Sequence, residues 1–269
     1  MHDYHIHTSF CKHAEGEIND YIEAAIEKGI TEICFTDHIP MPDNFDPNHR
    51  MFEKEFEQYV GKIEMARARY RHMPILIGIE AEYIEGYEEY LQRFLASYPF
   101  DIVIMAVHFI KKWTEKQWVF SYEYTDETIP HQYKDYFDSM LKGIQTKLFD
   151  VVGHLDLIKR LGHPVLTTNR PDVERVIQAA SDAGMSLELN TSGLRKQINE
   201  TYPTLEIIGM AAEKDIPIVF SSDAHKPEHV GDYFDDMLNE LFQFPNLKLG
   251  QYRQRKCLSK KILQPINEF

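Results

Sequence analysis

Cysteine is scarce in this chain: there are three in 269 residues. Cys11, Cys34 and Cys257 are widely spaced and form no C-x-x-C pair. That pattern argues against a disulfide framework and against a thiolate zinc site. A chain with so few cysteines and no disulfide pattern fits a reducing compartment, so we expect it in the cytoplasm.

Basic residues and long apolar runs are also few. The 29 basic residues face 43 acidic ones, for a formal net charge of −14, which disfavours a surface that binds nucleic acid through its phosphates. The longest apolar run, residues 102–107, is far shorter than a membrane span, and no signal or lipidation motif is recognisable. We expect neither a nucleic-acid nor a membrane partner. The oligomeric state stays open, a homo-oligomer included.

Short apolar segments alternate with longer amphipathic ones along most of the chain. Gly29 and Gly184 are placed to end two of the amphipathic segments as helix caps. About seven such alternations predict a parallel α/β sheet covered by helices, and closure into a TIM-like (β/α) barrel is favoured over an open sheet. No linker or repeat divides the chain, so residues 1–269 are expected to form one domain. The strand candidates are residues 4–7, 32–38, 74–80, 101–108, 150–154, 186–190 and 216–223, and the helix candidates are residues 17–29, 52–70, 87–97, 131–148, 171–184 and 205–215.

Two segments depart from this alternation. Residues 39–50 are rich in proline and asparagine and predict a loop, and residues 113–124 predict an extra hairpin. Both are expected on the rim of the barrel.

Polar side chains end every predicted strand. In a strand, positions i and i+2 face the same side, so His5 and His7 stand next to each other. The C-terminal strand ends of an α/β barrel converge on its active site, so residues far apart in sequence are expected to meet there. The residues concerned are His5, His7, Asp37, His38, Glu80, His108, His154, Asn190, Asp223 and His225.

A metal cluster is the chemistry that this set predicts. A single histidine at a strand end is more often structural, but many polar groups buried together need partners. One catalytic ion takes about three protein ligands, so nine candidates suit two or three ions. An imidazole-rich set without thiolates favours Zn, Fe or Mn. The nine candidates are His5, His7, His13, His38, Glu80, His108, His154, Asp223 and His225.

Other polar residues have supporting or neutral interpretations. Asp37 and Asp156 are expected to orient ligand imidazoles, and Glu82, one strand step beyond Glu80, is an alternative ligand. The remaining histidines are interpreted as surface or structural residues, although His229 is expected close to the rim; they are His2, His49, His72, His131, His163 and His229.

The ordered set of motifs resembles the PHP (polymerase and histidinol phosphatase) family. The family's H-x-H opening appears as His5-Ile6-His7, and its later motifs as His13, "TDH", "GIE", "VHF", "GHLD" and "SSDAH". Within the family, "VHFIKKW" and "SSDAHKPEHVG" are most similar to the histidinol-phosphate phosphatases of histidine biosynthesis. The resemblance implies a distorted seven-stranded (β/α) barrel, in agreement with the strand count.

The resemblance also implies which residues hold which ion. His5, His7, Glu80 and Asp223 would hold one ion. Glu80 would bridge to a second ion, held with His108 and His154. A third ion would take His13, His38 and His225.

The implied reaction is hydrolysis of L-histidinol phosphate to L-histidinol and phosphate, by a hydroxide shared between ions. Asp223, Glu80 and His225 are the expected catalytic residues. Arg160 and Arg195 follow strand ends and are candidates to bind the anionic substrate, because the guanidinium fork matches phosphate.

Three other functions stay open. The same site would suit a nuclease or a general phosphoesterase of the wider family, and an amidohydrolase also builds barrel metal sites from His and Asp. A non-catalytic module that binds phosphorylated metabolites through metal is the third alternative. The negative net charge of the chain argues against nucleic acid as the substrate.

Overall fold

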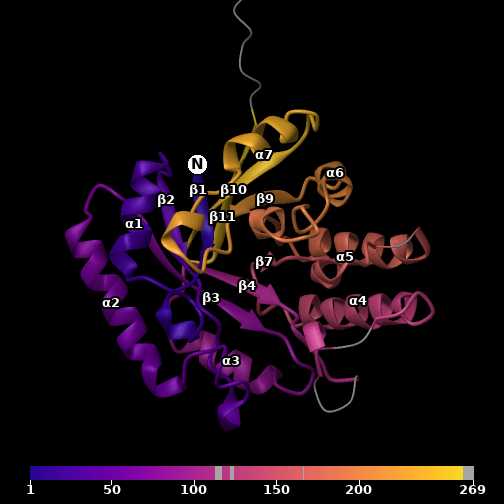
Figure 1. Cartoon of the computed structure of the whole chain (residues 1–269), viewed down its shortest axis with the longest axis horizontal. Coiled ribbons are helices and arrows are strands. Elements are labelled where there is room, and N and C mark those ends of the chain that lie inside the picture. Colours follow the sequence, from indigo (N-terminus) through magenta and orange to yellow (C-terminus); the bar gives the residue numbers. More distant parts are fainter. Residues whose placement is uncertain (113–116, 122–123, 166, 263–269) are drawn as a thin grey trace, which may run out of the picture.

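The computed structural model describes residues 1–112, 117–121, 124–165 and 167–262, and shows the predicted alternation of strands and helices. Seven parallel strands are surrounded by helices (Figure 1). Among the described residues no helix combines the length and apolar character needed to cross a membrane. The strands are β1 His2–Ile6, β2 Glu32–Phe35, β3 Ile75–Glu82, β4 Ile102–Ala106, β7 Val151–Val152, β8 Ser186–Asn190 and β9 Pro217–Ser221, and the helices are α1 Ile18–Glu27, α2 Phe56–Arg69, α3 Glu88–Ala96, α4 Ile129–Gln145, α5 Arg170–Asp182, α6 Leu205–Glu213 and α7 Phe234–Leu241.

The seven strands lie side by side in chain order and form a distorted, TIM-like barrel. No hydrogen-bond ladder between β9 and β1 closes the ring within the described residues. A single parallel bridge joins Ile6 to Ala224 just beyond β9, where the His7 N–H donates to the Ala224 carbonyl at 2.9 Å. This contact brings the first and last polar strand ends together, as the sequence predicts.

Helix ends follow the local sequence signals. Beyond α1, Gly29 has φ +70°, and beyond α5, Gly184 has φ +67°, a backbone conformation that glycine adopts without steric cost. Each glycine lets the chain leave its helix and turn into the next strand. Both predicted caps are confirmed.

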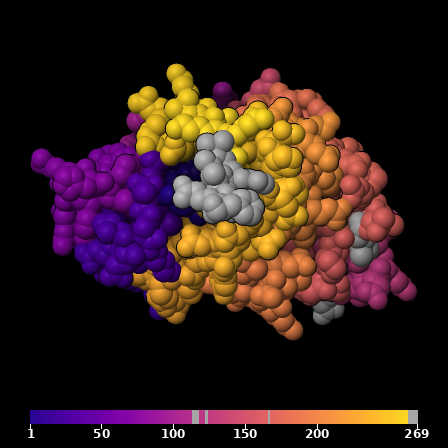
Figure 2. All heavy atoms as spheres, turned by 90° about the horizontal axis from the view of Figure 1, so that it is seen from above, coloured from indigo at the N-terminus to yellow at the C-terminus, as the bar shows by residue number. Residues whose placement is uncertain are grey.

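The end of the barrel opposite the site is closed by a hairpin that the sequence analysis did not anticipate. β10 (Lys248–Arg253) pairs parallel with β9 and antiparallel with β11 (Lys256–Lys261). Tyr252 of β10 packs with Tyr4 and Val219 in the second apolar cluster of the barrel. Figure 2 shows this last part of the chain beside the first part. The hairpin thereby shields this end of the barrel from water.

The predicted rim hairpin is confirmed in part. Strands β5 (Phe109–Ile110) and β6 (Gln117–Trp118) pair antiparallel, and a short 3-10 helix, Val119–Ser121, follows them. The pairing therefore begins upstream of the predicted range 113–124. Residues 113–116 and 122–123 of that range lie outside the described residues.

Candidate metal centre

Glu80 of β3 lies at the centre of the site and is almost fully buried. Its Oε2 lies 2.5 Å from His38 Nδ1, 3.4 Å from His5 Nε2 and 3.6 Å from His7 Nε2. Three imidazoles from β1 and from the loops after β1 and β2 therefore gather on one carboxylate oxygen.

The other oxygen of Glu80 faces a second group of imidazoles. Oε1 lies 2.9 Å from His154 Nε2 and 3.8 Å from His108 Nε2, which follow β7 and β4. One carboxylate thus stands between two sets of nitrogen atoms, which is the arrangement of a ligand that bridges two ions.

The remaining three candidates complete the cluster. Asp223 Oδ1 lies 3.3 Å from His7 Nε2, and the His225 ring stacks on His7 with centroids 4.1 Å apart. The rings of His13 and His225 lie 4.5 Å apart. Asp223 adopts φ +50°, an uncommon backbone conformation for a residue with a side chain, and such strain is frequent at functional sites. All nine predicted candidates therefore meet at one mouth of the barrel.

Several groups of these atoms are close enough to share an ion. Within each group, one ligand atom per residue lies within 4.8 Å of the others. The groups formed only by the nine candidates are His5–His7–Glu80, His38–Glu80–His108 and His7–His38–His225.

Buried nitrogen atoms without hydrogen bonds also fit a metal centre. His5 Nε2, His7 Nε2 and His225 Nε2 are buried and make no hydrogen bond to any described residue. Such groups are costly to bury unpaired, and an ion would satisfy them together. The donor set of imidazole nitrogen and carboxylate oxygen suits Zn, Fe or Mn.

The electrostatics of the cluster depend on its buried charges. Burial raises the pKa of Glu80, but the charge of His5 and the hydrogen bonds from His154 and His38 outweigh burial and hold that pKa well below its usual value. Burial lowers the pKa of His38 well below its usual value, despite the opposing effect of Glu80. An anionic carboxylate beside a neutral imidazole is the state in which both bind metal.

Glu188 contacts the cluster, although the sequence analysis did not single it out. This fully buried side chain of β8 lies 2.6 Å from His5 Nδ1 through Oε1, and its Oε2 accepts the backbone N–H of His154 at 2.6 Å. It thereby fixes the His5 ring with Nε2 directed at Glu80. The signal was present, because Glu188 alternates with Asn190 and so shares its face of the strand.

Two further carboxylates, Glu82 and Asp37, lie beside ligand imidazoles. Glu82 lies 2.9 Å from His108 Nδ1 and accepts the His108 N–H at 2.6 Å. It therefore orients His108, and the alternative that Glu82 is itself a ligand is not favoured. Asp37 accepts hydrogen bonds from Thr8 and lies 3.5 Å from His7 Nδ1, which makes no hydrogen bond to any described residue, so its orienting role stays a prediction.

The orienting role predicted for Asp156 is wrong. Its Oδ2 lies 2.9 Å from Lys159 Nζ and accepts the Thr204 N–H at 3.1 Å. Lys159 is fully buried and also donates to the Thr201 carbonyl. This ion pair connects the loop after β7 to the loop after β8. Asp156 therefore stabilises the wall of the pocket and does not orient an imidazole.

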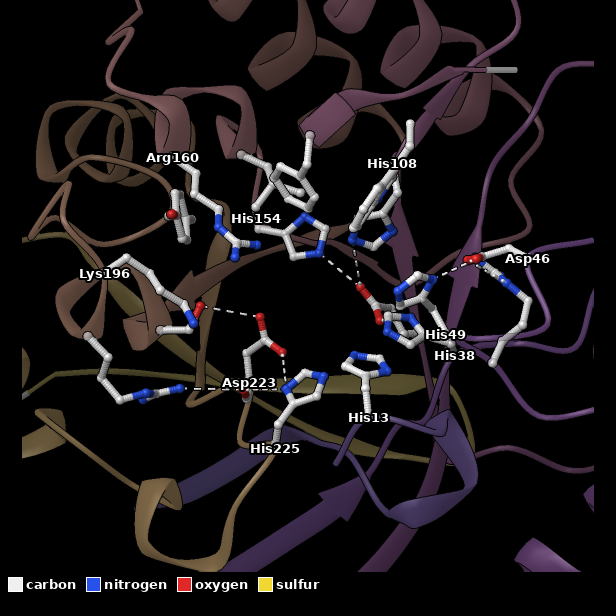
Figure 3. Close-up of a pocket in the computed structure, with 18 of the residues that line it drawn as sticks. His13, His38, Asp46, His49, His108, His154, Arg160, Lys196, Asp223 and His225 are labelled. Atoms are coloured by element: carbon white, nitrogen blue, oxygen red, sulfur yellow. Dashed lines mark hydrogen bonds and ion pairs between the residues drawn. The ribbon is translucent and has the colours of Figure 1, made fainter. Parts of the chain in front are cut away.

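The cluster opens into a pocket of about 420 Å³, a size suited to a small metabolite. Figure 3 shows Arg160 and Lys196 on one side of this pocket, with Asp223, His225 and His13 below them toward the opposite side. One side of the pocket therefore carries cationic side chains, and the other carries imidazoles and the Asp223 carboxylate.

Three cations form one wall of the pocket. Arg160 lies over the Phe120 ring at 4.5 Å, and neither Arg160 nor Lys196 has an ion pair with any described carboxylate. Burial and the nearby Arg160 lower the pKa of Lys196. Arg195 instead donates to the Ser222 carbonyl at 2.6 Å. Unpaired cations around a pocket in an acidic protein favour an anionic ligand.

Sequence reasoning placed two pocket residues differently from the structure. His49, interpreted as surface or structural, lines the pocket beside Asp46, and Lys196 was not singled out. Nothing in the loop sequence 39–50 indicates which of its side chains turn inward. His229 lines the pocket, as predicted for the rim.

A parallel α/β barrel with an imidazole and carboxylate cluster at the C-terminal strand ends defines a class of metal-dependent hydrolases. Two family models match this chain: the PHP domain over residues 3–192, and the PHP-associated segment over residues 206–236. The chain belongs to the PHP domain family, which confirms the resemblance seen in the sequence.

Curated relatives and a solved structure agree with this assignment. The chain is 34% identical to a probable histidinol-phosphatase of Deinococcus radiodurans, over 89% of this chain and 92% of that protein. It is 32% identical to the histidinol-phosphatase of Bacillus subtilis, over 88% and 97%. A crystal structure of histidinol phosphate phosphatase from Lactococcus lactis, complexed with zinc, L-histidinol and phosphate, matches with a TM-score of 0.80 and 22% identity, over 96% and 98%. That match confirms the predicted fold.

Proposed function

We propose that this chain is a metal-dependent phosphomonoesterase that hydrolyses L-histidinol phosphate to L-histidinol and inorganic phosphate. The observation that carries the proposal is a single pocket in which the Glu80 cluster faces the unpaired cations Arg160 and Lys196. A phosphate monoester dianion needs both features. The names of the relatives from Deinococcus and Bacillus support the choice of substrate.

We assign the ion sites as the resemblance to the PHP family implies. His5, His7, Glu80 and Asp223 would hold the first ion, and Glu80 would share a second ion with His108 and His154. His13, His38 and His225 would hold a third. Zn, Mn or Fe is the expected metal, and zinc is present in the Lactococcus structure.

The protein groups then have separate tasks. Bound ions would neutralise phosphoryl oxygens and lower the pKa of a water molecule. Arg160 and Lys196 would bind the phosphoryl group, whereas Arg195 would both face that group and hold the Ser222 carbonyl next to Asp223. We keep Glu80, Asp223 and His225 as the catalytic residues, because all three line the pocket.

The cellular setting is part of the proposal. We infer a role in histidine biosynthesis in the cytoplasm, on a small anionic phosphate and without nucleic acid as a partner. Two predictions complete the proposal: residues 1–269 form one domain, and the chain can form a homo-oligomer.

Phosphate release by the purified holoprotein tests this function. We expect turnover of L-histidinol phosphate that greatly exceeds turnover of p-nitrophenyl phosphate, single-stranded DNA and a dipeptide. Preference for DNA would indicate a nuclease, and cleavage of the dipeptide an amidohydrolase. Tight binding of histidinol phosphate without turnover would indicate a binding module, and each of these three results would overturn the proposal.

A further inference from the structure

The pocket has two chemically different sides, and the site described so far uses only one. Figure 3 shows Arg160 and Lys196 on one side, and His49 with Asp46 on the opposite side beyond the histidine cluster. Both His49 and Asp46 belong to the loop between β2 and α2. A substrate whose phosphoryl group lies at the cluster and the cations therefore directs its other half toward this second side.

Asp46 and His49 form a defined hydrogen-bonded pair. Asp46 Oδ1 lies 2.6 Å from His49 Nδ1. An ionised carboxylate only accepts hydrogen bonds, so the proton of this contact is on Nδ1, and in the neutral form of the ring Nε2 is then the acceptor. His49 Nε2 has no hydrogen-bond partner among the described residues. It is available to accept a hydrogen bond from an N–H group in the pocket.

A buried arginine holds this pair in place. Arg50, with 3% of its surface exposed, donates to Asp46 Oδ2 at 3.2 Å and to the Ile39 carbonyl at 3.2 Å. The same guanidinium lies 3.5 Å from Glu82, which orients His108. The position of His49 is thus fixed relative to the metal centre, which a recognition group requires.

Aromatic surface adjoins the pair. The Trp118 ring of β6 lies 5.1 Å from the His49 ring at an interplanar angle of 33°. Trp118, Phe109 and Phe120 all line the pocket. Such faces bind planar rings and cationic groups. Among the described residues that line the pocket, Asp46 is the one carboxylate besides Glu80 and Asp223.

The geometry points to the wall formed by Asp46, His49 and Trp118 as the subsite that recognises the alcohol half of the substrate. Its chemistry fits an alcohol that carries a planar ring and N–H donors with positive charge, and excludes a second anionic group. This inference rests on the proposed function, since L-histidinol, with its imidazole and its amine, is an alcohol of this class. His49 and Trp118 then set specificity, whereas the metal centre sets the reaction.

Paired kinetics with two substrates test the subsite. L-histidinol phosphate presents the ring and the amine, and p-nitrophenyl phosphate lacks the amine and the N–H donors. We expect His49→Ala to lower the ratio of kcat/KM for histidinol phosphate to that for p-nitrophenyl phosphate by about tenfold or more, the effect of one lost hydrogen bond to a charged group. Both substrates carry a planar ring, so Trp118→Leu should lower this ratio only through the lost contact with the cationic amine, by about two- to fivefold. His72→Ala is the matched control, because His72 is exposed and lies outside the pocket.

A second measurement separates this inference from the proposed function. Inhibition of p-nitrophenyl phosphate hydrolysis by L-histidinol reports binding of the alcohol alone, and His49→Ala should raise the inhibition constant about tenfold. If the unaltered holoprotein does not hydrolyse histidinol phosphate, the proposed function fails, whatever the inhibition shows. If it does, but the variants change neither the ratio nor the inhibition constant, the subsite is refuted.

Discussion

Replacement of Glu188 by Gln should weaken metal binding without altering any proposed ligand. Glu188 accepts two hydrogen bonds, from His5 Nδ1 and from the His154 backbone N–H, both at 2.6 Å. A glutamine of nearly the same volume has one acceptor oxygen, and its NH₂ group would face a donor. At least one buried donor is therefore left unsatisfied, which costs about 1–3 kcal/mol.

That cost should appear in the affinity for metal. Loss of a residue that orients a histidine ligand typically weakens binding about 10- to 100-fold. Competition between the protein and a chelator of known affinity, read by elemental analysis, would measure the change directly. Glu89→Gln is the matched control, because Glu89 is exposed on α3.

A merely structural role for Glu188 predicts a different pattern. Thermal stability would fall in Glu188→Gln, while the metal affinity of the folded protein would equal that of the control variant. Unchanged metal affinity would refute the positioning role, and with it the inference that His5 is held as a ligand.

Three further predictions concern stability and substrate binding. Burial lowers the pKa of His2 to about 3, so below about pH 6.5 the unfolded state takes up a proton on His2 that the folded state does not, and the protein loses stability as the pH decreases. The loss of unfolding free energy between pH 7 and pH 5 should therefore be smaller in His2→Phe than in the unaltered protein, by up to about 2 kcal/mol. Equal losses in the two proteins would contradict this prediction. Lys159→Met leaves the buried Asp156 carboxylate without its cation and should lower the free energy of unfolding, measured with denaturant, by about 3–5 kcal/mol. Adding Asp156→Asn should restore part of this stability. A decrease below about 1 kcal/mol would contradict a stabilising role for the Asp156–Lys159 ion pair. Arg160→Ala should mainly raise KM, whereas Arg195→Ala should also lower kcat, because Arg195 holds the backbone beside Asp223, which we propose as a catalytic residue. Identical kinetic changes in the two variants would contradict this distinction.

The parts of the fold that depend on local periodicity were predictable from the sequence. Seven buried strands, helices α1 to α6 and the glycine caps Gly29 and Gly184 follow from apolar spacing and backbone conformation. The hairpin β10–β11 was missed, because its residues are largely polar and half-exposed, so the sequence Lys248–Lys261 carries little apolar signal. Helix α7 was missed as well.

The site was predictable to the extent that topology determines it. Residues at C-terminal strand ends must converge in a barrel, and the nine candidates do. Contacts made by loops were not predictable: Asp156 pairs with Lys159 and not with an imidazole, and His49 turns into the pocket. Those orientations depend on partners distant in the sequence.

The central claim is that the nine side chains around Glu80 hold metal ions. Elemental analysis of the purified chain and of Glu80→Ala, with anomalous diffraction to locate the ions, tests it most directly. The account predicts two or three transition-metal ions per chain within the cluster, and loss of at least the two that Glu80 would share in the variant. A folded chain that takes up no transition metal, or a Glu80→Ala protein with undiminished metal content, would contradict it.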